Sequence, residues 1–411
     1  MTEVTHDAIE RAFRDEYGKV VATLIRQVGD FGLAEDAVQD AVTAALTSWP
    51  ASGVPQNPGA WLTTTARRKA IDRLRRRVNY ESKLAQLEYL VRLDETSNQG
   101  DDVDSQIEDD QLRLIFTCCH PALALEAQVA LTLKTLGGLS TAEIAHAFLV
   151  GEATLAQRIV RAKRKIKQAG IPYRVPPDAQ LPDRTEAVLA VIYLIFNEGY
   201  SATGGEEIVR RELCSDAIRL GIAVSDLMPD EAEALGLTAL MGFNHARRDV
   251  RSKDGVVVLL ENQDRSRWHR GEIDEAATLL DRAIRLERPG QYQLQAAIAA
   301  LHADAPSFED TDWPQILALY DRLHSKRPDP VVALNRAVAI AMAEGTEAGL
   351  ASMETLAKDL DGYPWFHSAR AEMLRRLGRF DEATLAFRRA IDLTNNSDAR
   401  AFLEDRLAGL A

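Results

Sequence analysis

The segment of residues 154–167 combines a basic surface with apolar residues at helical spacing, which predicts an amphipathic helix. A shorter helix is expected at residues 140–148, because Ser140 and Glu143 have the spacing of a capping box. Such a pair is typical of a helix-turn-helix, whose second helix enters the DNA major groove. A basic surface helix in an all-α bundle is the alternative. The side chains expected at DNA are Thr154, Ala156, Gln157, Arg158, Arg161, Lys163 and Arg164.

A second basic cluster, residues 67–77, holds seven cations and one anion and follows an aromatic residue, Trp61. An aromatic side chain beside cations could hold an unstacked base while the cations bind its phosphates. Trp61 could equally be a core residue, and the arginines could form a solvated helix face. The candidates for contact with opened DNA are Trp61, Arg67, Arg68, Lys69, Arg73, Arg75, Arg76 and Arg77.

A third group of candidate residues consists of two carboxylates and one amide. Asp36, Gln39 and Asp40 are spaced so that they share one face of a helix expected at residues 33–46. They could be ordinary surface groups, but apolar residues flank them, which favours a stripe that docks on a partner protein. A loop rich in proline and glycine is expected after this helix, at residues 50–58.

The charge is segregated along the chain, which has a net charge of −13. Residues 94–110 carry eight anions and no cation, so an extended acidic strap is expected between the two basic modules. Residues 175–411 hold 27 cations and 39 anions, and residues 175–182 read as a stiff linker before this acidic half.

The acidic half reads as helical hairpins. Residues 268–286 match residues 374–393, and the glycines of the two segments, Gly271 and Gly378, lie 107 residues apart. This is close to three periods of the tetratricopeptide repeat, about 34 residues long. A helical bundle with one chance match is the alternative. The whole chain is therefore expected to be all-α.

Several classes of site are not expected. Cys118, Cys119 and His120 lack the further ligands of a structural zinc site, and no metal or cofactor is expected. No motif of nucleotide binding or nucleophilic catalysis occurs, so the chain is not expected to be an enzyme. The longest apolar run, ten residues, is too short to cross a bilayer, and no secretory signal begins the sequence, which favours a cytoplasmic location. The loop expected at residues 196–205 offers a possible pocket at Asn197, Glu198 and Tyr200.

Residues 9–170 resemble a group IV (extracytoplasmic function, ECF) sigma factor of bacterial RNA polymerase, and the remainder resembles the subgroup with a tetratricopeptide-like extension. Residues 34–40 resemble region 2.2, residues 60–77 resemble regions 2.3 and 2.4, and residues 112–166 resemble region 4. The implied domains are region 2 (residues 9–80), an acidic linker (81–110), region 4 (111–174) and a helical regulatory domain (183–411).

The resemblance implies an alternative sigma factor that binds the β′ and β subunits of core RNA polymerase and promoter DNA. Region 2 would dock on β′ and open the −10 element, and region 4 would read the −35 element. The sequence lacks the usual cation at Ala156, which puts the ordinary −35 sequence in doubt. The extension could bind a protein or peptide and regulate the sigma domains. A helix-turn-helix repressor or adaptor with a repeat domain is the alternative.

Overall fold

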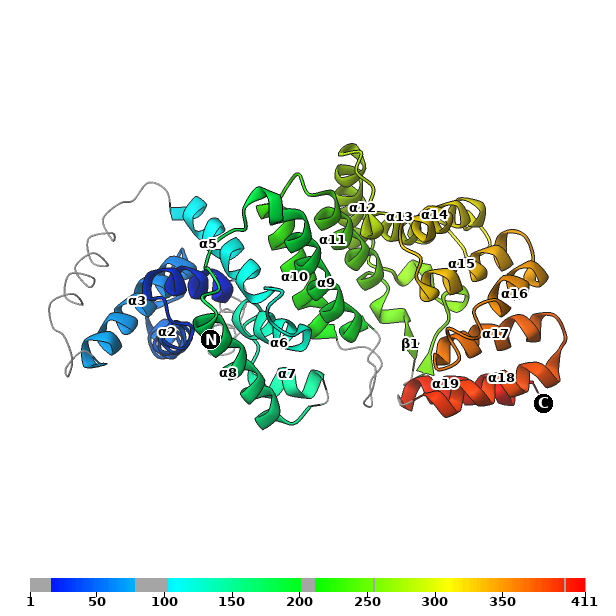
Figure 1. Cartoon of the computed structure of the whole chain (residues 1–411), viewed down its shortest axis with the longest axis horizontal. Helices are drawn as coiled ribbons and strands as arrows, with labels where there is room; N and C mark the ends of the chain where they lie inside the picture. Colours follow the sequence, from blue (N-terminus) through cyan, green and yellow to red (C-terminus); the bar gives the residue numbers. More distant parts are fainter. Residues whose placement is uncertain are drawn as a thin grey trace. The chain divides into compact units, whose positions relative to one another are not determined.

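The computed structural model describes residues 16–77, 103–148, 150–200, 211–253, 256–394 and 397–410. These residues are almost entirely helical, as predicted (Figure 1). The exception is a two-stranded antiparallel pair, β1 (Ser252–Lys253) and β2 (Val256–Val257). The chain divides into two compact units, residues 1–192 and 193–411, so that the division falls inside one helix, α9 (Leu181–Tyr200). No described helix is both long and apolar enough to span a membrane.

The first unit begins with a helix at residues 16–28, followed by α2 (Phe31–Ser52) and α3 (Pro58–Arg77), which pack on each other. The Asp30 side chain caps α2 by accepting a hydrogen bond from the Leu33 N–H, 2.9 Å. The loop expected at residues 50–58 is wrong over its first three residues, because α2 includes Pro50 and continues to Ser52. The carbonyl oxygen of the buried residue Trp49 accepts a hydrogen bond from the backbone N–H of Gly53. Gly53 has a φ of 83°, which ends the helix.

The segment expected to form region 4 holds the end of α5 (Val103–Cys118), α6 (Leu125–Thr135), α7 (Thr141–Ala147) and α8 (Glu152–Gln168). The extended strap expected at residues 94–110 is wrong over its last eight residues, which form the start of α5. Its carboxylate Asp110 is 1% exposed and lies 2.7 Å from the Arg26 guanidinium and 3.3 Å from that of Arg113. Two cations thus neutralise a buried carboxylate that the composition of the segment had predicted to be exposed to solvent.

The helix-turn-helix is confirmed as a structure. Ser140 donates its backbone N–H to the Glu143 carboxylate at 2.6 Å, and Glu143 donates its own to the Ser140 hydroxyl at 3.1 Å, which completes the predicted capping box. α8 turns four apolar side chains into the core and leaves its cations outside; the buried residues are Leu155, Ile159, Ala162 and Ile166.

After region 4 the chain forms a short 3-10 turn, η2 (Asp178–Gln180), and enters α9. The helix continues through Phe196 to Tyr200, so the loop expected from residue 196 is wrong over these five residues. The apolar run that begins at Ala187 supplies the reason, since Val188, Ile192 and Phe196 are all buried along one side of α9.

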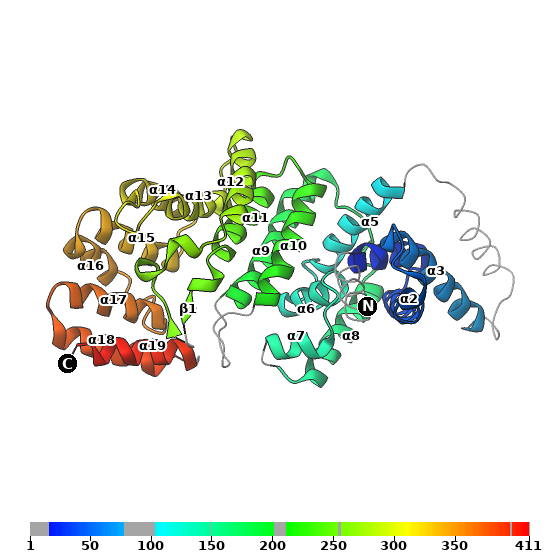
Figure 2. The ribbon, with the colours of Figure 1, turned by 180° about the vertical axis from the view of Figure 1, so that it is seen from behind.

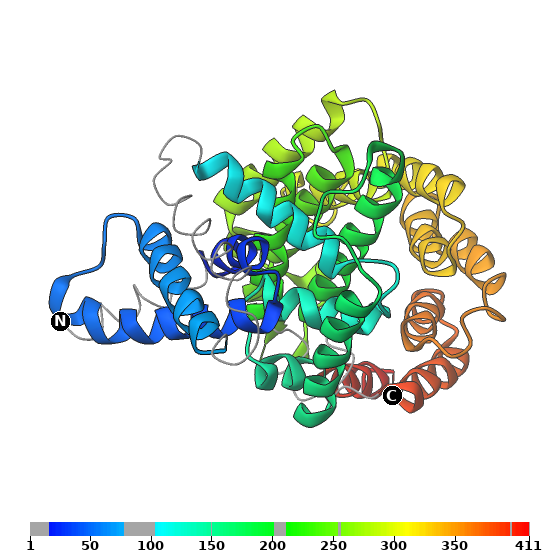
Figure 3. The same ribbon diagram turned by 60° about the vertical axis from the view of Figure 1, so that its left-hand side comes forward.

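The second unit is a succession of helices that follow one another around a curve, visible in Figures 1 and 3. Most helices pack on the next one along the chain, as in antiparallel helical hairpins. Their bounds are α10 (Arg211–Leu227), α11 (Ala232–His245), α12 (Arg270–Arg285), α13 (Gln291–Asp304), α14 (Trp313–Lys326), α15 (Pro330–Ala343), α16 (Thr346–Glu354), α17 (Pro364–Arg376), α18 (Phe380–Leu393) and α19 (Ser397–Ala408).

The two matching sequence segments form α12 and α18, and their buried residues coincide. Ala276, Leu280 and Ala283 face the core in α12, and the residues 107 positions later, Ala383, Phe387 and Ala390, do so in α18. Both helices follow a helix on which they pack, α11 and α17 respectively. The repeated spacing therefore corresponds to a repeated packing arrangement.

A long connection between α11 and α12 contains three 3-10 turns, η3 (Arg248–Val250), η4 (Leu260–Asn262) and η5 (Arg265–Arg267), together with β1 and β2. Val257 and Leu259 of this connection pack against the core of α15 and α17–α19. The connection lies on the inner side of the curve of helices, as Figures 1 and 2 show from opposite directions. This part of the inner face is therefore covered by the chain itself.

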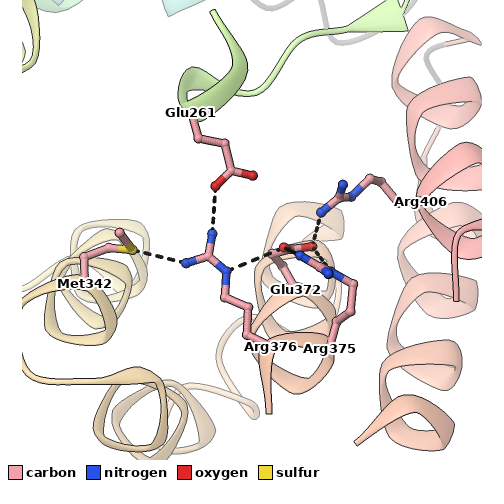
Figure 4. A network of polar contacts seen from close by, with 6 residues as sticks. All are labelled: Glu261, Met342, Glu372, Arg375, Arg376 and Arg406. Carbon is pink, nitrogen blue, oxygen red and sulfur yellow. Dashed lines mark hydrogen bonds and ion pairs between the residues drawn. The ribbon is translucent and has the colours of Figure 1, made fainter. Parts of the chain in front are cut away.

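An ion-pair network fixes that connection (Figure 4). Arg376 of α17 binds Glu261 of η4 at 2.9 Å, 115 residues away in sequence. Glu372, one turn earlier in α17, binds the guanidiniums of Arg375 at 2.6 Å and Arg406 of α19 at 2.5 Å. The network thus joins η4, α17 and α19.

Candidate nucleic-acid interface

α8 presents most of its predicted DNA-contacting side chains to solvent. Thr154, Gln157, Arg161 and Arg164 are exposed, whereas Ala156 and Arg158 are half-buried. Burial of its apolar stripe against the rest of region 4 holds the helix with these groups outward. Glu152 in the first turn and Lys165 and Lys167 in the last turn suit the helix dipole. The helix that carries this polar and basic surface is about 25 Å long, given 17 residues at ~1.5 Å each.

Lys163 differs from the other predicted contacts on α8, because it is bound within the chain. Its Nζ lies 2.6 Å from a carboxylate oxygen of Glu35 in α2, and the two side chains are 20% and 12% exposed. The residues are 128 positions apart in sequence. A cation predicted to contact phosphate is therefore paired with a carboxylate beside the predicted docking stripe.

The basic cluster of region 2 lies on α3. Arg68, Lys69 and Arg75 are exposed, and Arg67 and Arg73 are half-buried. The side chains of Arg76 and Arg77, also predicted to contact DNA, lie outside the described residues. Ala66, Ala70 and Ile71 form the buried face that sets the orientation of the exposed cations.

Arg73 contacts the predicted docking stripe itself. Its guanidinium lies 2.6 Å from Asp36 and 2.8 Å from Asp40, both on α2. Gln39, the third member of the stripe, is exposed on the same helix. The stripe thus lies on one face of α2, and one cation of the predicted DNA-contacting set neutralises two of its members.

Trp61 combines the two interpretations that its sequence position allowed. Its ring packs edge-to-face on Trp49, with ring centroids 5.3 Å apart. Trp49 is 2% exposed, whereas Trp61 is half-buried. One side of the Trp61 ring is therefore held by the core, and part of its surface is open to solvent.

The three residues of the predicted pocket lie in the last turn of α9, in the second unit. Tyr200 stacks on Phe196, and its phenol accepts a hydrogen bond from Arg247 at 2.6 Å, while Arg251 lies over its ring. Burial raises the pKa of the phenol, but the cations Arg247 and Arg251 outweigh it, so that the Tyr200 pKa is lowered. Asn197 and Glu198 are half-buried. None of the three lines the cavity of about 600 Å³ between α12, α13 and α14.

Cys118 and Cys119 are free thiols buried in region 4. Burial raises the pKa of Cys119 to about 11, with a partly opposing hydrogen bond from Thr132, and burial also raises that of Cys118. Among the described residues no group of three potential ligands could hold a metal.

Sequence reasoning missed the residues that join region 2 to region 4. Glu35, Arg26, Asp110 and Tyr173 carry no local motif, and each contact joins positions more than 60 residues apart. Tyr173 offered a signal, since it is an aromatic residue between Pro172 and Pro176 in the connection after the helix-turn-helix.

Comparisons with known protein families agree with these elements. Residues 12–79 match the family "Sigma-70 region 2", and residues 113–166 match the family "Sigma-70, region 4". Residues 184–284 match a family of unknown function, DUF6596.

Two relatives add to this. An uncharacterized protein of Rhizobium meliloti is 46% identical over 396 residues, which cover 96% of this chain and 93% of the relative. A probable ECF RNA polymerase sigma factor, SigI, of Mycobacterium tuberculosis is 27% identical over 172 residues, 42% of this chain and 59% of SigI.

The chain is a sigma factor of the sigma-70 type, because both sigma-70 regions match it and each contributes a basic helix in the first unit. Within that class, the chain belongs to the family of the Rhizobium meliloti protein, whose similarity extends through both units.

Proposed function

We propose that the chain is a group IV (ECF) sigma factor. In this proposal, Asp36, Gln39 and Asp40 on α2 dock on the β′ subunit of core RNA polymerase, and region 4 also contacts the β subunit. α3 then opens and reads the −10 element, and α8 reads the −35 element. The polymerase supplies the catalysis, so the chain is not itself an enzyme, and it acts in the cytoplasm.

One observation carries the proposal. The sigma-70 region 2 and region 4 of this chain each turn a basic helix face to solvent, with Arg68, Lys69 and Arg75 on α3 and Arg161 and Arg164 on α8. Cations of this kind supply phosphate affinity, and Gln157 beside them adds a side chain able to bond base edges. A repressor with a single helix-turn-helix has no use for the α3 surface.

We further propose that the second unit is a tetratricopeptide-like domain that regulates the sigma domains in cis. The equal spacing of buried residues in α12 and α18 supports the repeat, and net acidity beside basic modules motivates the regulation. A protein or peptide ligand on its outer or remaining inner surface would be the signal. Because η4 and β2 cover part of the inner face, that ligand must bind elsewhere or displace them.

Run-off transcription with purified core polymerase tests the proposal. The promoters come from the neighbourhood of the gene, and the full chain is compared with a truncation after Tyr200, which keeps α9 whole. Core-dependent initiation by the full chain is expected, and an altered output from the truncation would support cis regulation. Absence of initiation, with tight duplex binding in the absence of polymerase, would favour the repressor interpretation. Unchanged output from the truncation would refute the regulatory role.

A further inference from the structure

The cavity of the second unit lies among three consecutive helices, α12, α13 and α14. α12 and α14 both pack on α13 (Figure 1), and residues of all three helices line a space of about 600 Å³. The lining begins at Arg270, the first residue of α12, and continues past the end of that helix to Glu287. At ~1.5 Å per residue this is a length of about 25 Å. The cavity is therefore an elongated groove, the α12–α14 groove.

Apolar and small side chains line most of this groove. Its buried apolar residues are Ile273, Leu280 and Leu294. Alanine occupies three more lining positions, namely Ala277, Ala297 and Ala300. A leucine at such a position would fill the space that the alanine methyl group leaves open, so the short side chains account for the hollow.

One large apolar side chain of the groove is open to solvent. Ile284 of α12 is 51% exposed. Its counterpart 107 residues later, Ile391 of α18, packs against a core that includes Phe402 and Leu403 of α19. The two helices share their other buried positions, so the difference marks Ile284 as a residue that lacks a covering helix.

The charged residues of the groove are mostly carboxylates. Two cations line it, Arg270 and Arg322, and Arg270 already donates to the carbonyl oxygen of Ala303 at 3.0 Å. The lining carboxylates, all exposed, are Asp274, Asp281, Glu287 and Asp304. Within the described ranges of the chain, none of these four is held in an ion pair. The groove therefore has unsatisfied negative charge along its edges.

This negative charge is a feature of the groove and not of the repeated segment as such. Arg282 and Arg285, also on α12, are not among the lining residues. The position of Asp281 is occupied by Arg388 in the matching helix α18. α12 thus directs carboxylates toward the groove and places these two cations elsewhere, which favours a partner with positive charge.

The dimensions of the groove indicate the shape of that partner. A volume of about 600 Å³ over about 25 Å gives a mean cross-section of roughly 25 Å², whereas a helix with its side chains is about 10 Å wide. The groove therefore accepts one row of side chains from a helix that lies along it. An amphipathic helix presents such a row at every third or fourth residue. A compact ligand would leave much of the length empty.

We propose that the α12–α14 groove binds an amphipathic helix of a partner protein, whose apolar row fills the groove and whose flanking lysines or arginines pair with Asp274, Asp281 and Asp304. The inference rests on the proposed regulatory role of the second unit and names the chemistry of its partner. The groove shares no residue with the core that Val257 and Leu259 cover. The partner can therefore bind without displacing η4 or β2.

Fluorescence anisotropy with a designed peptide tests the inference in the full chain. The labelled probe is a helix of about 18 residues, the length that spans the groove, with leucine at every third or fourth position and lysine beside that row. Micromolar or tighter binding is expected, and a peptide of the same composition in scrambled order should bind at least tenfold more weakly. Absence of binding, or equal binding of the two peptides, would overturn the inference.

Matched charge variants on α12 locate the bound peptide. Asp281→Lys reverses a lining carboxylate and should weaken binding about tenfold. Glu275→Lys makes the same change at an exposed carboxylate of α12 that does not line the groove, so it is the control and should alter binding less than twofold. Equal effects of the two variants would show that the peptide responds only to the net charge of the chain, and would refute the site.

Two further variants test the apolar part of the groove. Ala297→Leu fills it and should weaken binding at least tenfold. Because overpacking can also destabilise the helices, Ile284→Ser is measured beside it. This exposed side chain adds little to the core, and its loss should weaken binding about fivefold. Unchanged binding in both variants would place the peptide outside the groove. None of these measurements uses polymerase or a promoter, so their outcome is independent of the run-off transcription test.

Discussion

The guanidinium of Arg73 in α3 donates to the Asp40 carboxylate of α2, with Nε 3.0 Å from Oδ2. This bond joins a residue of the predicted DNA-contacting set to a residue of the predicted polymerase-docking stripe. Both side chains are more than a third exposed, so the bond itself adds little to stability. Under the proposed function, polymerase and DNA would each have to replace a partner that these side chains already have within region 2.

Replacing Arg73 should therefore separate two activities. Arg73→Gln frees Asp36 and Asp40 from their shared cation, so affinity for core polymerase should rise about twofold to tenfold, while promoter opening falls. Asp40→Asn should lower polymerase affinity by more than tenfold and the unfolding free energy by less than ~1 kcal/mol. Fluorescence titration with core polymerase and permanganate footprinting measure the two activities.

Asp72→Asn is the control for these variants, since Asp72 is an exposed carboxylate on α3 close in sequence to Arg73. It should alter neither polymerase affinity nor opening. Parallel losses of polymerase affinity in Arg73→Gln and Asp40→Asn would contradict the competition and show that the bonded pair, intact, forms the docking surface.

Trp61 should serve both the core and promoter opening. Trp61→Ala removes an edge-to-face partner of Trp49 and part of a packed ring, so the unfolding free energy should fall by about 2 kcal/mol. Trp61→Phe retains a ring against Trp49 and should cost less than ~1 kcal/mol. Denaturant unfolding and open-complex assays of both variants separate the two roles: normal opening by Trp61→Phe would argue that any aromatic core residue suffices.

Local patterns sufficed for some elements and failed for others. The spacing of Ser140 and Glu143 and the apolar stripe of α8 predicted the helix-turn-helix, because caps and amphipathic faces are formed by residues close in sequence. The acidic composition around Asp110 predicted a solvent-exposed residue, but Asp110 is buried in an ion pair with Arg26, which is 84 residues away in sequence. Pairings over such distances leave no periodic signal, so the ends of the acidic strap and of α9 were misplaced.

The candidate site shows the same division. Residue type and helical spacing predicted basic faces on α3 and α8, and many of those cations are exposed in the structure. It could not show that Lys163 is paired with Glu35 or that Arg73 is paired with Asp36, since each pair depends on how two helices pack. These two ion pairs can therefore be found only from the tertiary structure.

Alkaline pH should destabilise region 4 through Cys119. Burial raises its pKa from 9.0 to about 11, so the folded state holds the thiol proton more tightly than the unfolded state does. The stabilisation is complete below pH 9 and is lost as the pH rises through 11, an effect of about 3 kcal/mol. Unfolding of wild type and Cys119→Ala, measured between pH 8 and 11, isolates this contribution from other alkaline titrations. Equal pH dependence in the two proteins would show that the thiol is not the titrating group.

Acidic pH should weaken the second unit through Glu372, the carboxylate shared by Arg375 and Arg406 (Figure 4). Burial by itself would raise the Glu372 pKa, but hydrogen bonds from the two guanidiniums outweigh it, so the pKa is lowered below its ordinary 4.5. A carboxyl with a depressed folded-state pKa stabilises the fold above its unfolded-state value. That contribution disappears as the pH falls through the lower, folded-state value.

Glu372→Gln should remove this acid sensitivity and lower the unfolding free energy at pH 7 by about 1 to 3 kcal/mol, because two partly buried arginines lose their shared anion. The matched control is Glu382→Gln, which removes an exposed carboxylate bonded to Arg379 and should leave the unfolding free energy almost unchanged. Amide hydrogen exchange of α17 and α19 at pH 4 to 7 measures the effect locally in the full chain. If protection of these helices depends on pH equally in wild type and Glu372→Gln, the network does not hold η4, α17 and α19 together, and apolar packing of Val257 and Leu259 must do so.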